Sequence, residues 1–322
     1  MMTDSGMLDT RFREAVSAID AGDVATLERL LALHPGLVHD RLDAPGAWLR
    51  DQVGAALDGF FRQPYLLWFV AEDPVRTGTL PRNIAQVART IIHAAQRDGV
   101  ISLHAQLDHA LRLVCWSWIA RECGVQIELM DVLIDAGASL DGRTVYQGRY
   151  GTHSDAAIYN GNVAAARHLV ARGAPLTLTT ALCVGRWADV ERLASGATRG
   201  EQQNAFVQAA RNGNADALRV MVALGVDPTT VSEGNQSHGT ALHHAVWSGC
   251  FDAVRVLVKA GADLSRRDTS YGGTPLGWAL YGEQQQQEAV RGAVNEAAVH
   301  RAGVPKQYRE IATYLREQGG EE

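Results

Sequence analysis

The chain has 322 residues, 46% of them hydrophobic, and a net charge of −6 with its basic residues dispersed among acidic ones. This composition provides ample material for a continuous core, and the dispersed charge argues against nucleic acid, which needs a basic surface. No run of 18 apolar residues exists, the first residues lack a basic stretch followed by an apolar one, and the four cysteines are scattered. We therefore expect a cytoplasmic protein with no membrane segment or membrane partner, no metal site and no cofactor.

The first 38 residues predict one pair of short helices. Leu27, Leu30 and Leu31 recur with helical spacing, Gly22 separates the two helices, and Pro35 follows the second one. Two helices of this length cannot bury such an apolar face alone. We therefore expect residues 1–38 to cap a stack of similar units.

Residues 39–105 depart from this pattern. The stretch 58–70 holds five aromatic residues, and apolar residues with helical spacing then predict a helix from about 82 to 97. In one interpretation this helical insertion seals a small core of its own. In another it forms a wall or lid over a binding groove, with Tyr65 and Trp68 as aromatic anchors for a ligand or peptide. A third interpretation is self-association through an exposed apolar patch.

Glycines mark a repeated helix pair in residues 106–322. Those that close the second helix of each pair lie 23 to 36 residues apart and are Gly137, Gly173, Gly196, Gly225 and Gly261. A glycine suits this position because the chain reverses there through a left-handed conformation. An insertion at 283–307 divides the last unit, and we place its second helix near Tyr308 to Gln318.

Two hexapeptides give the repeat a family resemblance. Residues 240–245 (Thr-Ala-Leu-His-His-Ala) and 274–279 (Thr-Pro-Leu-Gly-Trp-Ala) resemble the Thr-Pro-Leu-His-x-Ala signature of ankyrin repeats. The layout is also similar to that of a group of bacterial ankyrin-repeat proteins of unassigned function. The resemblance implies an all-α ankyrin-repeat solenoid of about six to seven helix pairs, with the helical insertion after the first repeat. It further implies that the concave face binds a partner.

The ends of the first helices carry side chains suited to such contacts. In successive units these positions are Glu122, Tyr159, Arg211, Trp247 and Tyr281. Stacked in register, they would form a ladder along one side of the molecule. Trp187 and Phe251 follow the first-helix glycine instead, and we expect both in the core.

Histidine and carboxylate side chains are the candidates for catalytic residues in this sequence. His153 and Asp155 could form an acid/base pair, with Arg149 and His244 nearby, although Asp155 could equally cap a helix. The resemblance implies that His243 hydrogen-bonds backbone in neighbouring loops. No phosphate loop, His-Glu-x-x-His or Gly-x-Ser-x-Gly motif is present. We therefore favour a chain without catalytic residues, although catalytic groups drawn from separate repeats would leave no local motif.

These patterns favour a binding module that recognises a protein or peptide partner through the concave face. We expect its contacts at Tyr65, Trp68, Glu122, Arg149, Tyr159, Arg211, Trp247 and Tyr281. The alternative is a small-molecule-binding protein or enzyme with a pocket between this groove and the 39–105 insertion, served by His153, Asp155 and His244.

Overall fold

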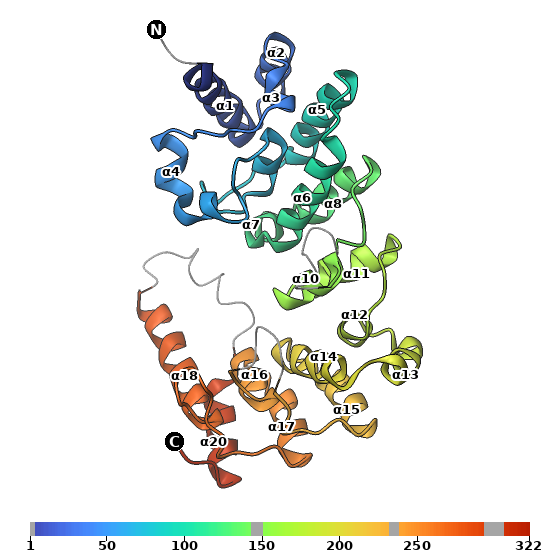
Figure 1. Cartoon of the computed structure of the whole chain (residues 1–322). Coiled ribbons are helices and arrows are strands. Elements are labelled where there is room, and N and C mark those ends of the chain that lie inside the picture. The colour runs from blue at the N-terminus through green and yellow to red at the C-terminus, as the bar shows by residue number, and fades with distance from the viewer. Residues whose placement is uncertain (1–3, 143–150, 232–237, 293–305) are drawn as a thin grey trace. The chain divides into compact units, whose positions relative to one another are not determined.

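The computed structural model describes residues 4–142, 151–231, 238–292 and 306–322 (Figure 1). The secondary structure in these ranges is helical, apart from one isolated bridge between Val231 and Thr240. The predicted all-α fold is therefore confirmed. Contacts divide the chain into two compact units, Met1–Pro175 and Leu176–Glu322.

The N-terminal unit is a stack of paired elements. Three pairs are α-helical: α1 (Asp4–Ala21) with α2 (Val24–Leu33), α6 (Leu103–Trp116) with α8 (Gln126–Asp135), and α10 (His153–Tyr159) with α11 (Val163–Ala171). A fourth pair joins the 3-10 helix η2 (Leu66–Ala71) to α5 (Ile84–Arg97). The connections contain α3 (Gly36–His39), α4 (Ala47–Val53), η1 (Gly54–Asp58) and α7 (Trp118–Glu122).

The C-terminal unit repeats the arrangement with four pairs. They are α12 (Leu178–Val184) with α13 (Trp187–Gly196), α14 (Arg199–Arg211) with α15 (Ala215–Ala223), α16 (Ala241–Ser248) with α17 (Phe251–Lys259), and α18 (Pro275–Gly292) with α20 (Tyr308–Glu317). The first helices α12, α14, α16 and α18 pack side by side in one row (Figure 1). Over the described residues of both units, seven α-helical pairs agree with the predicted six to seven. Helix α20 also lies where the second helix of the divided unit is predicted.

Side-chain caps explain where many of these helices begin. First helices start after a threonine whose hydroxyl accepts a backbone N–H in the first turn, as Thr152, Thr198 and Thr240 do. Three second helices, α2, α11 and α15, start after a carboxylate or amide in the same role, at Asp23, Asn162 and Asn214. Apolar residues facing the space between the rows then form the core, which in the C-terminal unit includes Leu182, Phe206, Leu242 and Leu276.

The second half of the 39–105 insertion occupies a place in the N-terminal stack. Helix α5, predicted at about 82 to 97, packs between α2 and α8, while η2 packs between α1 and α6. The side chains of Phe61, Trp68 and Phe69 are at most 5% exposed. The insertion therefore shares its aromatic core with the neighbouring helices.

The expectation of a buried Trp187 is wrong, because its side chain is 44% exposed. Trp187 is the first residue of α13, which packs on α12 but has little contact with α15. Without a close neighbour in the second row, α13 leaves this indole uncovered. Phe251 is partly buried as predicted and its ring lies 5.3 Å from that of Tyr314.

Candidate functional site

Three predicted contact residues lie at equivalent repeat positions on neighbouring first helices in the C-terminal unit. The expectation that the last of these helices ends at Tyr281 is wrong, because α18 continues to Gly292. Arg211 is the last residue of α14, Trp247 lies in the last turn of α16, and Tyr281 lies on α18. Helix α16 packs against both α14 and α18, as Figure 1 shows. Trp247 is 43% exposed, Tyr281 is 54% exposed and Arg211 is half-buried. We call these three residues the helix-end surface.

Trp247 is held from two directions. Its ring lies 6.0 Å from the ring of Trp278 in an edge-on arrangement, and the Lys306 ammonium lies 5.3 Å from its centroid. The carbonyl oxygen of Trp247 accepts hydrogen bonds from Lys306 Nζ at 2.9 Å and from the Tyr308 hydroxyl at 3.0 Å. Burial raises the pKa of Tyr308 to about 12, so this hydroxyl stays a donor at neutral pH. These contacts hold the inner part of Trp247 in place and leave the outer part of its indole exposed.

A carboxylate fixes Trp278 behind this surface. Asp268 accepts the indole N–H of Trp278 at 2.9 Å and backbone N–H groups of the following turn, including that of Gly273 at 2.8 Å. Burial alone would raise the pKa of Asp268. The hydrogen bonds from Trp278 and from the turn outweigh this effect and lower the pKa to about 2.

His243 has the backbone role implied by the resemblance. Its Nδ1 accepts the N–H of Thr240 at 3.2 Å, so Nε2 carries the proton and donates to the carbonyl oxygen of Gly273 at 3.1 Å. Burial lowers the pKa of His243, which keeps the ring neutral. His244 is also buried, with its ring 5.4 Å from that of His238 and 6.0 Å from that of Trp278. Both histidines thus contribute to packing beneath the helix-end surface.

The other predicted ladder residues lie in the N-terminal unit. Tyr159 ends α10 and is partly buried, while Glu122 ends the short helix α7 and is exposed. Helix α6 stops at Trp116, and Ser117 caps α7, so Glu122 lies on a separate turn. Arg149 lies outside the described residues.

The predicted aromatic anchors of the insertion are turned inward. Tyr65 is 8% exposed and Trp68 is 5% exposed. The Trp68 ring stacks on the His109 ring at 3.8 Å, and the Arg41 guanidinium lies 4.6 Å from the Tyr65 ring centroid. Burial, with the charge of Arg112, lowers the pKa of His109 to about 3, so the stacked imidazole is neutral. These aromatics join η2 to α6 and offer little surface to a ligand.

The residues considered for catalysis have structural contacts as well. Asp155 accepts the backbone N–H of Thr152 at 3.2 Å, and Thr152 accepts the N–H of Asp155, which confirms the predicted capping role. His153 is fully buried, and burial lowers its pKa to about 4. His153 and Asp155 belong to the N-terminal unit, whereas His244 belongs to the C-terminal unit.

Sequence reasoning missed Lys306 and Trp278, although both contact Trp247. Trp278 stands at the variable fifth position of the ankyrin signature, so the motif gave no reason to single it out. Lys306 carries no signal either, because it lies near the end of the insertion at 283–307, where no repeat motif applies. Its contact with Trp247 depends on the path of the chain after 305.

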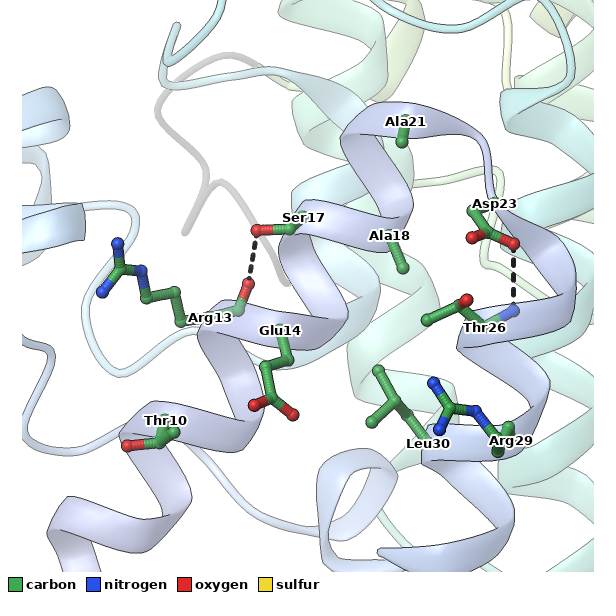
Figure 2. A pocket seen from close by; sticks show the side chains of 10 residues that line it. All are labelled: Thr10, Arg13, Glu14, Ser17, Ala18, Ala21, Asp23, Thr26, Arg29 and Leu30. Atoms are coloured by element: carbon green, nitrogen blue, oxygen red, sulfur yellow. Dashed lines mark hydrogen bonds between the residues drawn. The ribbon is translucent and has the colours of Figure 1, made fainter.

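An open groove of about 560 Å³ lies between α1 and α2. The residues that line it include the exposed Arg13 and Glu14 from α1 and Arg29 from α2 (Figure 2). Such a polar outer face is typical of the terminal unit of a repeat stack. Among the described residues, no helix is long and apolar enough to span a membrane, and no group of three or more His, Cys, Asp or Glu could hold a metal ion.

Comparisons with known proteins complete the description. Residues 156–268 match the family model of ankyrin repeats in three copies. Among solved structures, the chain is similar to the ankyrin repeat domain of human ASB11, with 17% identity over 74% of this chain and 96% of that one and a TM-score of 0.37. It is also similar to the ankyrin repeat domain of Bcl-3, with 17% identity over 82% of this chain and 92% of that one and a TM-score of 0.37. No curated protein matches the chain.

Proposed function

Because its residues 156–268 identify this chain as an ankyrin-repeat protein, we propose that it is a non-enzymatic binding module for a protein or peptide partner. Stacked repeats of this kind create extended surfaces that hold other macromolecules. The face presented by the ends of the first helices, which is the concave face of the predicted solenoid, is the proposed contact site. A cytoplasmic location and the likeness to bacterial proteins of this kind stay predictions from the sequence.

The exposure of Trp247 and Tyr281 on neighbouring helices is the observation that carries this proposal. Their side chains are 43% and 54% exposed, above first helices whose other apolar residues are largely buried. Tryptophan, tyrosine and arginine contribute most to binding energy at interfaces, and Arg211 adds the third of these types. Glu122 and Tyr159 are proposed to extend the contact within the N-terminal unit.

Capture of a partner by the full chain tests this function. The bait is incubated with extract of the source cells, cross-linked, and compared with Trp247→Ala and Tyr281→Ala variants. Each substitution is expected to reduce capture of a specific protein by about 30-fold, the effect of losing a contact worth about 2 kcal/mol.

Trp187→Ala is the matched control, because Trp187 is 44% exposed but belongs to a second helix. It is expected to leave capture unchanged. The proposal fails if no protein is retained, or if the three variants retain it equally.

The small-molecule alternative would need the aromatics of the insertion to face a ligand. Tyr65 and Trp68 are instead packed against α6 and its connections, and His153 and Asp155 belong to the N-terminal end of α10. No observation in the described residues favours that alternative.

A further inference from the structure

We propose that the partner presents an acidic peptide segment with a neighbouring apolar side chain, and that Lys306 receives its carboxylate beside Trp247. This inference rests on the proposed function, because it names the chemistry of the partner at the helix-end surface. Lys306 was not among the residues expected to bind. The argument rests on its contacts, on the donors around it, and on the absence of a counter-ion among the residues that the structure describes.

Lys306 is held at the C-terminal end of α16. The backbone N–H of Gln307 donates to the carbonyl oxygen of Gly249 at 3.0 Å, which fixes the segment that follows the insertion. Gly249 allows this approach, because a Cβ there would lie 2.3 Å from the Cβ of Lys306. The position of the ammonium beside Trp247 is therefore determined by backbone contacts.

The ammonium keeps capacity for a partner. Lys306 Nζ donates to the carbonyl oxygen of Trp247 at 2.9 Å and to the Tyr308 hydroxyl at 3.2 Å. A lysine ammonium has three N–H groups, so one is left to donate outward. The indole N–H of Trp247 and the hydroxyl of Tyr281 likewise make no hydrogen bond with the described part of the chain.

No carboxylate of residues 4–142, 151–231, 238–292 or 306–322 forms an ion pair with Lys306. Glu283, two residues after Tyr281 on α18, is held by Arg309 at 2.9 Å. Asp268 is occupied by Trp278 and the turn that follows it. Burial lowers the pKa of Lys306, as is usual for a desolvated cation without a counter-ion. A carboxylate of a bound partner would stabilise the charge of the Lys306 ammonium.

The charged and aromatic side chains around Lys306 favour one kind of partner segment over others. The Lys306 ammonium beside Trp247 would repel a basic segment. The exposed rings of Trp247 and Tyr281 offer apolar area for a side chain next to the carboxylate. An acidic segment that also carries an apolar residue satisfies both features, whereas a purely acidic one would leave the rings uncovered.

Selection of peptides from a random library displayed on phage tests this inference with the full chain as the target. Peptides rich in Asp and Glu beside an aromatic or aliphatic residue are expected to be enriched. Lys306→Glu is expected to abolish the acidic enrichment, while Lys259→Glu, at the exposed end of the second helix α17, leaves it unchanged. Lys306→Met keeps the aliphatic stem over the ring but removes the charge. It is expected to lower the affinity for a selected synthetic peptide about tenfold, which corresponds to the loss of about 1.4 kcal/mol of binding free energy.

Enrichment of neutral or basic peptides would overturn the inference, as would unchanged selection by Lys306→Glu or the failure to select any peptide. Circular dichroism of each variant establishes that it is folded. If cross-linked capture depends on Trp247 and Tyr281 but not on Lys306, the binding function stands and the acidic partner is wrong. If capture depends on none of the three, the proposed function itself fails.

Discussion

The pairs η2/α5 and α16/α17 occupy equivalent places in their stacks but are held by different interactions. In α16/α17, Thr240 caps the first helix, and His243 joins that cap to the backbone of the next loop at Gly273. In η2/α5, the first element is a 3-10 helix with no side-chain cap, and its residues Leu66–Ala71 are all buried. A helix pair can therefore occupy a place in the stack without a polar cap when its apolar residues are buried between neighbouring helices.

The same comparison separates two roles of tryptophan. Trp68 of η2 is 5% exposed and stacks on His109, whereas Trp247 of α16 is 43% exposed. Aromatic side chains in the first pair hold the stack together. The indole of the second pair is 43% exposed and is the one that we propose as a partner contact.

The largest effect is expected from Trp68→Ala. Removing this buried indole should lower the free energy of unfolding by about 3–5 kcal/mol, since it leaves a cavity against His109 and Phe61. Denaturant unfolding followed by circular dichroism measures the change. Trp247→Ala should lower the free energy of unfolding by only about 1 kcal/mol, because this half-exposed indole loses little more than its contacts with Trp278 and Lys306. Equal losses of unfolding free energy in the two variants would contradict a structural role for Trp68 that Trp247 lacks.

Asp268→Asn is expected to lower the free energy of unfolding by about 1–3 kcal/mol at pH 7, because an amide accepts the hydrogen bonds of Trp278 and the turn less well. Because the pKa of Asp268 is lowered, its carboxylate is protonated at a lower pH in the folded state than in the unfolded chain. Its stabilisation is therefore present above pH 4 and lost between about pH 4 and pH 2. Unfolding of both proteins across this range measures the effect, and parallel pH profiles would contradict it.

Asp73, next to the η2/α5 pair, should behave in the opposite way. Burial raises the pKa of Asp73 to about 6, with Arg112 partly offsetting this and Glu72 adding to it. The folded state now binds the proton more tightly, so ionisation costs stability as the pH rises from about 4 to 6. Asp73→Asn should therefore stabilise the chain by about 1–2 kcal/mol at pH 7 and have little effect at pH 3.5. A destabilised variant at pH 7 would contradict this assignment.

Trp187→Ala should have the smallest effect, within about 0.5 kcal/mol of the unsubstituted chain. Its indole is 44% exposed on α13, where the sequence predicts a core residue. Thermal unfolding compared with Phe251→Ala, at the equivalent position of α17, tests the difference. A loss at Trp187 as large as that at Phe251 would mean that this indole is covered.

The regular part of the fold could be predicted because its signals are local. Glycines, threonine caps and helical spacing predict the pairs of the C-terminal unit, and the apolar spacing at 82–97 predicts α5. The place of η2 in the stack could not be predicted, because a short apolar run has no helical period and its burial depends on α1 and α6.

The candidate site, like the fold, was predictable only where it depends on the repeat pattern. The repeat register identifies Arg211 and Trp247 at the ends of α14 and α16 and Tyr281 at the equivalent position of α18, but it did not predict that α18 continues to Gly292. Lys306 could not, since its contact with Trp247 joins residues separated by a long insertion. The inward orientation of Tyr65 and Trp68 also depends on α6, a neighbour that lies far along the sequence.

Site-specific photo-cross-linking tests the central claim most directly. A photoreactive phenylalanine analogue is placed at Tyr281, which is 54% exposed on the helix-end surface, or at Tyr271, which is 85% exposed in a loop. The account predicts a discrete protein adduct from source cells at position 281, with none at position 271. Adducts at 271 alone, or no adduct at 281 when a partner is captured, would contradict it.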